Sequence, residues 1–534
     1  MVLLVGRADP GQDDPRGAEG TRRTVTGGPA STAGQHGDDR VGRTSLLLVP
    51  IALLSRGLAF AVPAVIALWF GVGPVTDAWY WSLALPTFTL VLASTALGTA
   101  AIPALARVRQ EVPARLPIFI GSLQCWAALG SGAFGLLVCL LAGPALAVVT
   151  EFPPETVSLA RAFLWELVPF MVLTTAGAVA RVANEVHGNF VAVAMTPMVR
   201  AGVVIASTWL LLAPLGPHAL PWGLVLGEAV QFLFWWGVLG WRDGVWPRPS
   251  LRLDPALLGV GRDLAPILAG EVLVALNLVV DKAFAAMLPP GSVATLEFAD
   301  RARVIPQTLL ESTLLMVAYA RWSNLFAAGR RVRARAEVAR SLRWVIVLAA
   351  PMLAGMFIGR QALVALLFQR GAFQAADTLA TARVLGWYLP GVLPNLVGIL
   401  AVRAHIVERN LRLVLVLGVV SVVVNLVLDA LLLRPFGLAG LALSTTLNMT
   451  LVPGLYLWAL RRTWAGPVEA GARRAWGRTG ALLAASVAVA AAVELTVGPP
   501  ASIASPALWI AALPCLLLLA LGWQLSRTAP ATVP

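Results

Sequence analysis

Residues 281–306 read DKAFAAMLPPGSVATLEFADRARVIP, and this stretch sets the interpretation of the whole chain. An apolar segment ends at the Pro-Pro-Gly sequence of residues 289–291, and a second apolar segment begins directly after it. The second segment carries four charged residues: Glu297, Asp300, Arg301 and Arg303. A charge in a membrane-spanning helix costs ~2.5–3.5 kcal/mol and usually faces the protein interior or a water-filled cavity. The stretch therefore predicts a membrane-embedded site for a polar or charged substrate; the alternative is that the charges are paired for structural reasons.

The composition indicates a membrane protein. The chain has 534 residues, of which 58% are hydrophobic and 13% charged, and its mean hydropathy is +0.80. A polytopic membrane protein has such a composition, whereas a soluble globular domain does not. The net charge of +13 comes from 40 basic and 27 acidic residues, and Lys282 is the only lysine. Because the basic residues lie in loops between apolar segments, the positive-inside rule explains their excess, and we expect no nucleic-acid partner.

Fourteen apolar segments follow from Ser45 onward, each near the ~20 residues that a membrane-spanning helix needs. They cover residues 45–71, 78–106, 116–142, 157–180, 190–213, 219–241, 264–288, 295–320, 341–368, 379–402, 411–433, 437–460, 479–497 and 506–525. We therefore predict an all-α polytopic membrane protein with about 14 transmembrane helices.

The arginines support this topology. Loops predicted to be cytoplasmic carry clusters that include Arg107, Arg109, Arg115, Arg242, Arg248, Arg252, Arg330, Arg331, Arg333, Arg403, Arg409, Arg461 and Arg462. Loops predicted to be external, namely 143–156, 214–218 and 498–505, contain neither Lys nor Arg. By the positive-inside rule both termini are cytoplasmic, and we expect the chain in the bacterial plasma (inner) membrane, surrounded by its lipids.

The predicted organisation is two six-helix lobes followed by two extra helices. The boundaries are a disordered cytoplasmic tail (1–44), an N-terminal lobe (45–242), a cytoplasmic linker (243–263), a C-terminal lobe (264–462), a cytoplasmic loop (463–478), two extra transmembrane helices (479–527) and a cytoplasmic tail (528–534). A weak internal repeat agrees with two lobes, because Asp77 precedes Pro86 by nine residues, as Glu297 precedes Pro306. Repeat-built transporters place their substrate site between the two halves.

The sequence carries no sign of an enzyme. It has no G-x-x-x-x-G-K-[ST] motif and no H-E-x-x-H motif, so neither an ATP site nor a zinc protease site is predicted. The four histidines, His36, His187, His218 and His405, are scattered. We predict no catalytic residues, no metal site and no cofactor other than a coupling Na⁺ or H⁺.

Two groups of polar residues within the apolar segments are candidate sites. Arginine binds phosphate through paired hydrogen bonds, so a cavity lined by Arg56, Arg301 and Arg303 would suit a diphosphate. Local pairing of Asp281 with Lys282, or of Asp300 with Arg303, is the alternative. Asn425 and Asp429 share one helix face because they are four residues apart; with Thr445 they offer oxygen ligands for a small cation. Hydrogen bonding between helices is the alternative for these three.

These residues belong to a pattern that resembles the MurJ/MviN family of lipid II flippases, in the multidrug/oligosaccharidyl-lipid/polysaccharide exporter superfamily. The pattern comprises Ser55-Arg56, Phe60-Ala61, Phe70-Gly71, Thr76-Asp77-Ala78, Leu85-Pro86, Ile102-Pro103, Pro290-Gly291-Ser292, Ala299-Asp300-Arg301, Pro306, residues 367–373, Asp377 and residues 437–442. The similarity runs from about Ser45 to Arg462. It implies two six-helix lobes in a V that work by alternating access, driven by an ion or potential gradient.

The resemblance also implies roles for individual residues. Arg56 and Arg301 match two arginines that hold the lipid-linked pyrophosphate in the family, and we group Asp77, Glu297, Asp300 and Arg303 with them as substrate-binding candidates. The family's sodium-type site resembles Asp281, Asn425, Asp429 and Thr445, with a main-chain oxygen near Leu441. The implied substrate is an undecaprenyl-diphosphate-linked saccharide, moved from the inner to the outer leaflet. We expect a monomer, with a glycan polymerase as a candidate partner.

Three departures from the family pattern keep the substrate open. Charged residues of the family are replaced by Val62-Pro63 in the first helix, and by Leu90-Val91 and Thr95 in the second. An exopolysaccharide repeat unit is therefore an alternative to lipid II. A cation-coupled drug antiporter of the same superfamily is a further alternative, and it would favour an acidic, aromatic cavity. A membrane glycosyltransferase or ligase is a third, but it would need a sizeable external loop with catalytic residues.

Overall fold

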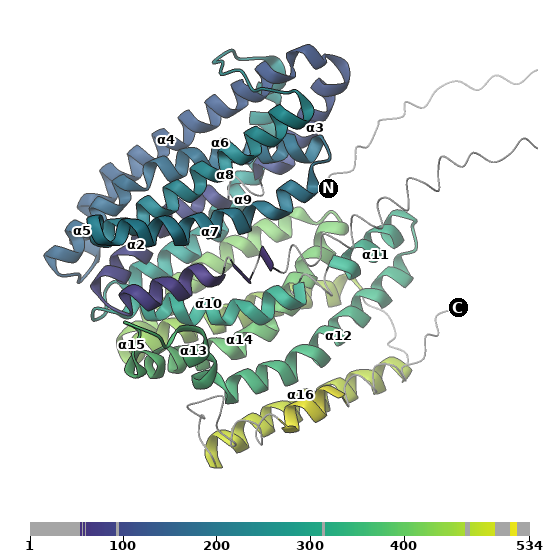
Figure 1. Cartoon of the computed structure of the whole chain (residues 1–534). Coiled ribbons are helices and arrows are strands. Elements are labelled where there is room, and N and C mark those ends of the chain that lie inside the picture. The colour runs from purple at the N-terminus through teal and green to yellow at the C-terminus, as the bar shows by residue number, and fades with distance from the viewer. Residues whose placement is uncertain are drawn as a thin grey trace, which may run out of the picture.

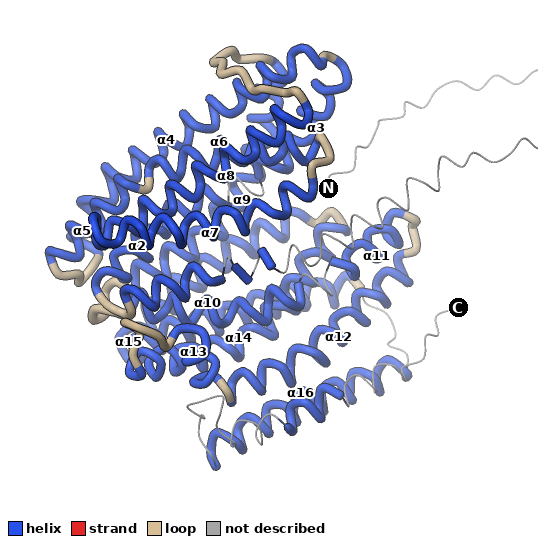
Figure 2. The backbone as a smooth tube through the Cα atoms, in the orientation of Figure 1, coloured by secondary structure: helices blue, strands red, loops and turns tan. Residues whose placement is uncertain are grey.

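The computed structural model describes residues 54–55, 57–58, 60–91, 96–311, 316–464, 470–496 and 513–520. Within these ranges the chain is helical apart from short connections, and it contains no strand (Figures 1 and 2). The predicted tails 1–44 and 528–534 lie outside the described residues, and so does Arg56.

The helices follow one another with short connections. The first half contains α2 (Pro74–Val91), α3 (Leu97–Glu111), α4 (Leu116–Val149), α5 (Pro154–Glu166), α6 (Val168–Val186), α7 (Phe190–Leu215), α8 (Ala219–Asp243) and α9 (Pro255–Ala285). The second half contains α10 (Ser292–Leu310), α11 (Met316–Ala327), α12 (Arg331–Ile358), α13 (Arg360–Phe368), α14 (Ala375–Val407), α15 (Leu411–Thr463) and α16 (Ala470–Thr496). Two short 3₁₀ helices, Pro113–Arg115 and Gly216–His218, precede α4 and α8.

The helices agree with the predicted membrane-spanning segments. Eight helical runs among the described residues are long and apolar enough to cross a membrane, and two of them, Phe190–Asp243 and Leu411–Thr463, exceed 50 residues and contain two predicted segments each. The backbone of α15 turns at Gly437, where φ is +55°. Phe60–Phe70 and residues 513–520 are helical within the first and last predicted segments. The all-α polytopic membrane fold is confirmed.

Two helices begin earlier than hydropathy predicted. The linker was predicted to extend to residue 263, but α9 starts at Pro255, after Asp254, whose side chain accepts the N–H of Ala256 at 3.1 Å. An Asp cap followed by proline at the first helical position is a strong helix start. Likewise α16 starts at Ala470, inside the predicted loop 463–478. Hydropathy detects the part of a helix that lies in lipid, whereas backbone hydrogen bonding continues into the polar ends.

The helices pack as two lobes. In the N-terminal lobe α6 packs on α4 and α8, α7 packs on α8, and α2 packs on α5. In the C-terminal lobe α10, α12 and α14 pack together and α14 packs on α15. Helix α9 contacts α15 and also α2 and α3, so it touches both lobes. Helix α16 lies along α12 at the edge of the bundle (Figure 1). The bidentate ion pair between Arg360 and Glu494, at 2.5 and 2.7 Å, holds one end of α16 in place.

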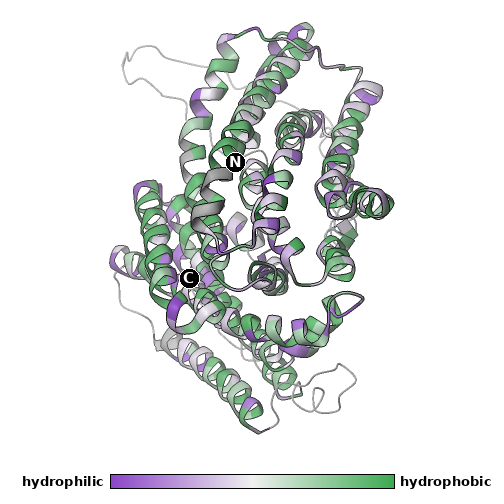
Figure 3. Ribbon diagram, turned by 90° about the vertical axis from the view of Figure 1, so that its left-hand side faces the viewer, coloured by the Kyte–Doolittle hydropathy of each residue, from purple (hydrophilic) through white to green (hydrophobic). Residues whose placement is uncertain are grey.

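The surface is apolar, as a lipid-facing surface must be. Hydrophobic residues predominate along the helices (Figure 3), and large ones such as Trp209, Leu233 and Leu431 are exposed. A bilayer removes the penalty that water would impose on such a surface, while the helix satisfies its own backbone hydrogen bonds.

The two lobes meet where α2 and α10 begin, and we call this the closed end. The Ala372 N–H donates to the Leu68 carbonyl at 2.9 Å, and the Glu151 N–H donates to the Ala286 carbonyl at 3.0 Å. Rings also meet across the lobes, since Phe60 lies 6.1 Å from Phe368. The predicted topology places the closed end outside the cell.

Candidate functional site

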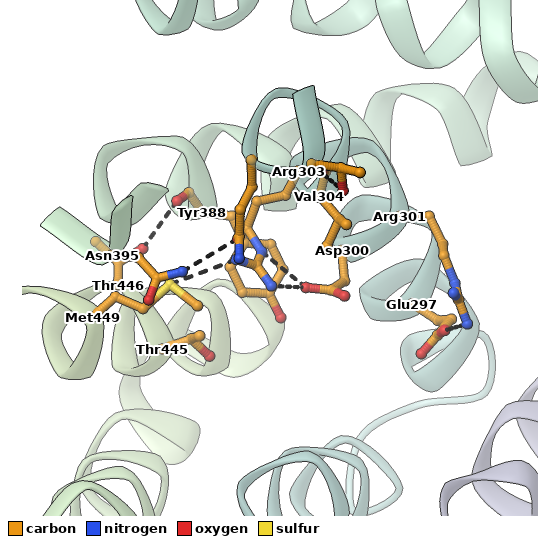
Figure 4. A network of polar contacts seen from close by, with 12 residues as sticks. Glu297, Asp300, Arg301, Arg303, Val304, Tyr388, Asn395, Thr445, Thr446 and Met449 are labelled. Carbon is orange, nitrogen blue, oxygen red and sulfur yellow. Dashed lines mark hydrogen bonds and ion pairs between the residues drawn. The ribbon is translucent and has the colours of Figure 1, made fainter. Parts of the chain in front are cut away.

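Four charged side chains project from helix α10 in two directions: Glu297, Asp300, Arg301 and Arg303. The helix begins after Gly291, whose φ of +93° suits glycine, and so follows the Pro-Pro-Gly break directly. Arg301 and Arg303 are two residues apart, which places them on different faces of a helix. Figure 4 shows Arg303 extending toward Tyr388 and Met449, while Arg301 extends elsewhere with Glu297 beside it. One helix thus serves two adjoining polar surroundings.

The first of these surroundings is a three-residue charge cluster. The Arg301 Nη2 atom lies 2.6 Å from Glu297 Oε1, and the Lys282 Nζ atom lies 3.0 Å from Glu297 Oε2. Glu297 and Lys282 expose only 6% and 7% of their side chains, whereas Arg301 exposes 44%. Charged side chains in membrane-spanning helices usually face the protein interior or a water-filled cavity. The cluster carries one excess positive charge, and Arg301 presents it.

The second surrounding is a cavity within the C-terminal lobe. Arg303 is buried and donates to Asp300 from Nε, at 2.8 Å, and from Nη2. Its guanidinium lies 5.4 Å from the centre of the Tyr388 ring and contacts Met449 Sδ. The cavity has a volume of about 630 Å³. Its polar lining comprises Asn277, Asp281, Lys282, Glu297, Asp300, Arg303, Tyr388, Asn395, Arg403, Ser421, Asn425, Thr445 and Asn448.

Three of the predicted cation-binding residues, Asp281, Asn425 and Thr445, line this cavity, and Asp429 and Leu441 contact two of them. The Asn425 side-chain amide donates to Asp281 Oδ1 at 2.5 Å and to Asp429 Oδ2 at 3.1 Å, so it bridges two carboxylates from α9 and α15. The other oxygen of Asp429 is buried and has no hydrogen-bond partner. The turn at Gly437 brings the second half of α15 back, where the Thr445 hydroxyl donates to the Leu441 carbonyl at 3.1 Å. Asp429 is buried and Asp281 is half-buried, and neither forms a salt bridge with a described residue. A cation or a proton would therefore stabilise the two carboxylates.

The cluster of oxygen atoms limits the kind of cation. Among the described residues no group of three or more His, Cys, Asp or Glu side chains is arranged to hold a metal ion. Two carboxylates, a hydroxyl and a carbonyl are hard oxygen donors, while the Asn425 amide turns its N–H groups to the carboxylates. They fit Na⁺ or H⁺ better than a transition metal, which prefers nitrogen and sulfur ligands.

Asp77 lies apart from the cavity, at the closed end. Its carboxylate accepts the backbone N–H groups of Gly291 and of Ala294, the latter at 2.8 Å. Asp77 is buried and so caps the start of α10 from the other lobe. An acid at this position also interacts favourably with the helix dipole. The structure therefore separates Asp77 from Arg303 and Asp300, with which it had been grouped.

Other ionisable residues of the spans are paired inside the N-terminal lobe. Arg200 Nε lies 2.6 Å from Glu228 Oε2, between α7 and α8, and His218 Nδ1 lies 2.8 Å from Glu166 Oε1. Pairing between neighbouring helices is how a bundle tolerates such charges. The suggested local pairing of Asp300 with Arg303 is present, whereas Lys282 pairs with Glu297 and not with Asp281. Side chains one residue apart on a helix do not face each other.

Several cavity residues were not predicted from the sequence. Ser421 lies four residues before Asn425, and Asn448 lies three residues after Thr445. These spacings extend the two polar faces of α15, and the Asn448 amide donates to Ser421 Oγ at 3.1 Å. The spacing could have revealed both. Asn395, which donates to Gln307 at 3.2 Å, had no such signal.

Comparisons with known proteins identify the family of the chain. The family model described as "Lipid II flippase MurJ" matches residues 66–504 of the chain. The chain belongs to this family. A probable lipid II flippase MurJ of Vibrio cholerae is 26% identical over 446 residues, which cover 78% of this chain and 83% of that protein. The lipid II flippase MurJ of Burkholderia cenocepacia is 25% identical, with 79% and 84% covered.

Solved structures share the fold. A lipid II flippase MurJ in an inward closed conformation has a TM-score of 0.74 at 18% identity and covers 90% of this chain and 98% of its own. An inward-facing multidrug transporter of the MOP superfamily has a TM-score of 0.64 at 14% identity, with 78% and 100% covered. Membership of the MurJ family makes this chain a multi-pass protein of the bacterial inner membrane that flips a lipid-linked precursor. It is a transporter and not an enzyme.

Proposed function

We propose that this flippase carries a polyprenyl-diphosphate-linked saccharide from the inner to the outer leaflet by alternating access. Lipid II is the first candidate substrate. The observation that carries the proposal is Arg301: a guanidinium held by the buried Glu297 on one side and 44% exposed on the other. A guanidinium can donate paired hydrogen bonds to a diphosphate, which a drug cation could not accept. With Arg56 of the first predicted segment, Arg301 would hold the headgroup between the lobes.

A cation would couple to this movement. Asp281 and Asp429 share the amide of Asn425, and the partnerless oxygen of Asp429 offers a ligand for Na⁺ or a position for H⁺. Thr445 and the Leu441 carbonyl would complete the site. Arg303 and Lys282 line the same cavity. A cation that enters the cavity therefore acts electrostatically on Arg303, which is part of α10. We propose a monomeric carrier that works in the membrane beside a glycan polymerase.

An exopolysaccharide repeat unit is the second candidate substrate. Val62, where lipid II flippases usually have a charge, lies among apolar residues such as Val65, Ile66 and Trp69 around a small cavity. The N-terminal lobe therefore lacks one positive charge that would help to hold a large headgroup. A different saccharide on the same diphosphate carrier would still use Arg301.

Complementation separates the two candidates. A strain depleted of its essential lipid II flippase would receive the wild-type chain, the Arg301→Ala variant, or the Arg383→Ala variant, in which an exposed arginine of the same lobe is removed. Rescue by wild type and by Arg383→Ala, with loss of rescue by Arg301→Ala, supports lipid II. Failure of all three, with each protein present in the membrane, overturns lipid II and favours another diphosphate-linked saccharide.

A further inference from the structure

Lys282 is the only lysine in a chain that otherwise uses arginine for every basic side chain. It lies near the end of α9, and its ammonium has two partners from different lobes. Nζ is 3.0 Å from Glu297 Oε2 in α10, and it donates to the backbone carbonyl of Tyr80 in α2 at 3.1 Å. A compact ammonium directs three donors tetrahedrally, whereas a guanidinium presents a planar fork. The two acceptors lie on separate elements, which suits an ammonium.

Tyr80 of α2 packs against the C-terminal lobe. Its ring packs edge-on against Phe298 of α10, with centres 5.4 Å apart, and Lys282 Nζ lies 6.0 Å from the ring centre. Both Tyr80 and Phe298 are buried. The Lys282 ammonium therefore closes a contact between the lobes that is otherwise apolar. A hydrogen bond from a charged donor is worth about 1.5–3 kcal/mol, more than a neutral one.

Glu297 connects this lobe contact to the substrate arginine. One carboxylate oxygen contacts Lys282 and the other contacts Arg301 at 2.6 Å. The two basic residues thus share one negative charge in a buried position. A diphosphate that draws Arg301 away leaves Glu297 to neutralise Lys282 alone. The ammonium then shifts toward Glu297 and away from the Tyr80 carbonyl.

We propose that Lys282 is a positioning residue that couples diphosphate capture at Arg301 to release of the lobe contact at Tyr80. The inference rests on the proposed function, because it takes a diphosphate as the ligand of Arg301. The carboxylate of Glu297 contacts both Lys282 and Arg301 when no diphosphate is bound. When a diphosphate binds Arg301, the carboxylate contacts Lys282 alone. Any ligand that favours one conformation must bind that conformation more tightly. Lys282 therefore keeps the closed end shut until a diphosphate draws Arg301 away from Glu297.

The test measures opening of the closed end and ligand binding in the same protein. Spin labels on cysteines at Glu155 and Ala376, which are exposed on the N- and C-terminal lobes at this end, report the distance between the lobes. Cys125, Cys139 and Cys515 are first replaced by serine. The probe ligand is inorganic pyrophosphate. The variants are Lys282→Met, which keeps length and removes charge, and Arg360→Met, which removes a buried basic residue paired with Glu494 and away from α2.

In the wild type, pyrophosphate is expected to raise the ratio of open to closed molecules. Lys282→Met is expected to raise that ratio about ten-fold without pyrophosphate, and to respond less than two-fold to saturating pyrophosphate. Arg360→Met should behave as the wild type. Loss of the response at saturating pyrophosphate in Lys282→Met, with Arg360→Met unchanged, distinguishes coupling from a general loosening of the fold.

Two results would overturn the inference. The first leaves the proposed function intact, and the second does not. If the wild type binds pyrophosphate through Arg301 but Lys282→Met opens and responds as the wild type does, the coupling role is wrong and the proposed function stands. If the wild type does not bind pyrophosphate, diphosphate recognition fails, and the coupling role fails with it.

Discussion

The carboxylate of Asp77 in α2 accepts the backbone N–H of Ala294 in α10 at 2.8 Å, across 217 residues of sequence and across the two lobes. It also accepts the N–H of Gly291, so one buried side chain satisfies two free donors at the start of α10. Closure of this end therefore depends on an acid from one lobe capping a helix of the other.

Asp77→Ala is expected to open the closed end. Each hydrogen bond to a charged acceptor contributes about 1.5–3 kcal/mol, so the ratio of open to closed molecules should rise at least ten-fold. The distance between labels at Glu155 and Ala376 measures it. Asp377→Asn is the matched control: Asp377 accepts the Gln374 N–H at 2.9 Å within one lobe, so its loss should leave the distance unchanged. Equal opening in both variants would contradict the role of Asp77.

A glycine makes possible the backbone contact between Ala372 and Leu68 at the closed end. A Cβ atom at Gly371 would lie within 2.4 Å of the Leu68 carbonyl oxygen, and φ is +59°. Gly371→Ala should therefore disfavour the closed conformation. Gly216→Ala is the control, because φ is +56° there but nothing lies near the added atom. Both variants carry the backbone strain, and only Gly371→Ala should change the distance between the lobes. A shift in neither would show that the loops do not limit closure.

The cation site predicts a stabilisation that depends on one carboxylate. A ligand at 100 times its Kd stabilises a protein by about 2.7 kcal/mol, so Na⁺ at saturating concentration should raise the Tm of the wild type relative to choline. Asp429→Asn should abolish the rise, and Asp263→Asn, at an exposed position, should keep it. If Na⁺ has no effect and acidification stabilises the wild type but not Asp429→Asn, the ion is H⁺. Absence of both effects would contradict a coupling site here.

Arg301→Ala should weaken pyrophosphate binding about 10- to 100-fold, because the contact to a charged acceptor is lost. Arg301→Lys should recover only part of the affinity, since an ammonium cannot form the paired contact. Calorimetry on the purified protein measures both, with Arg383→Ala as the control on an exposed arginine. Unchanged affinity in Arg301→Ala would remove Arg301 from the substrate site.

Much of the fold followed from the sequence, because the bilayer imposes a simple rule on helix length and hydropathy. The break at residues 289–291 fixed the start of α10, and the four-residue spacing of Asn425 and Asp429 fixed a shared face. Helix ends were less predictable. Helix α9 begins at Pro255 because Asp254 caps it, and hydropathy does not detect this start.

The partners of the charged residues could not be predicted, since they depend on how the lobes meet. Pairing of Lys282 with its neighbour Asp281 was the structural alternative from the sequence, but the packing of α9 on α10 turns Lys282 to Glu297. Asp77 was grouped with the substrate residues, and only the contact between α2 and α10 shows which donors it satisfies. Local spacing specifies a helix face, while the element opposite that face is set by the tertiary fold.

A flipping assay in proteoliposomes measures transport of a diphosphate-linked saccharide without any other cell component. Vesicles would contain undecaprenyl-diphosphate disaccharide with a fluorescent headgroup, and an impermeant quencher would report the fraction on the inner leaflet over time. We expect movement with the wild type and with Arg383→Ala, and none with Arg301→Ala. Movement at the same rate with Arg301→Ala, or none with a folded wild type under a Na⁺ or H⁺ gradient, would contradict the proposed function.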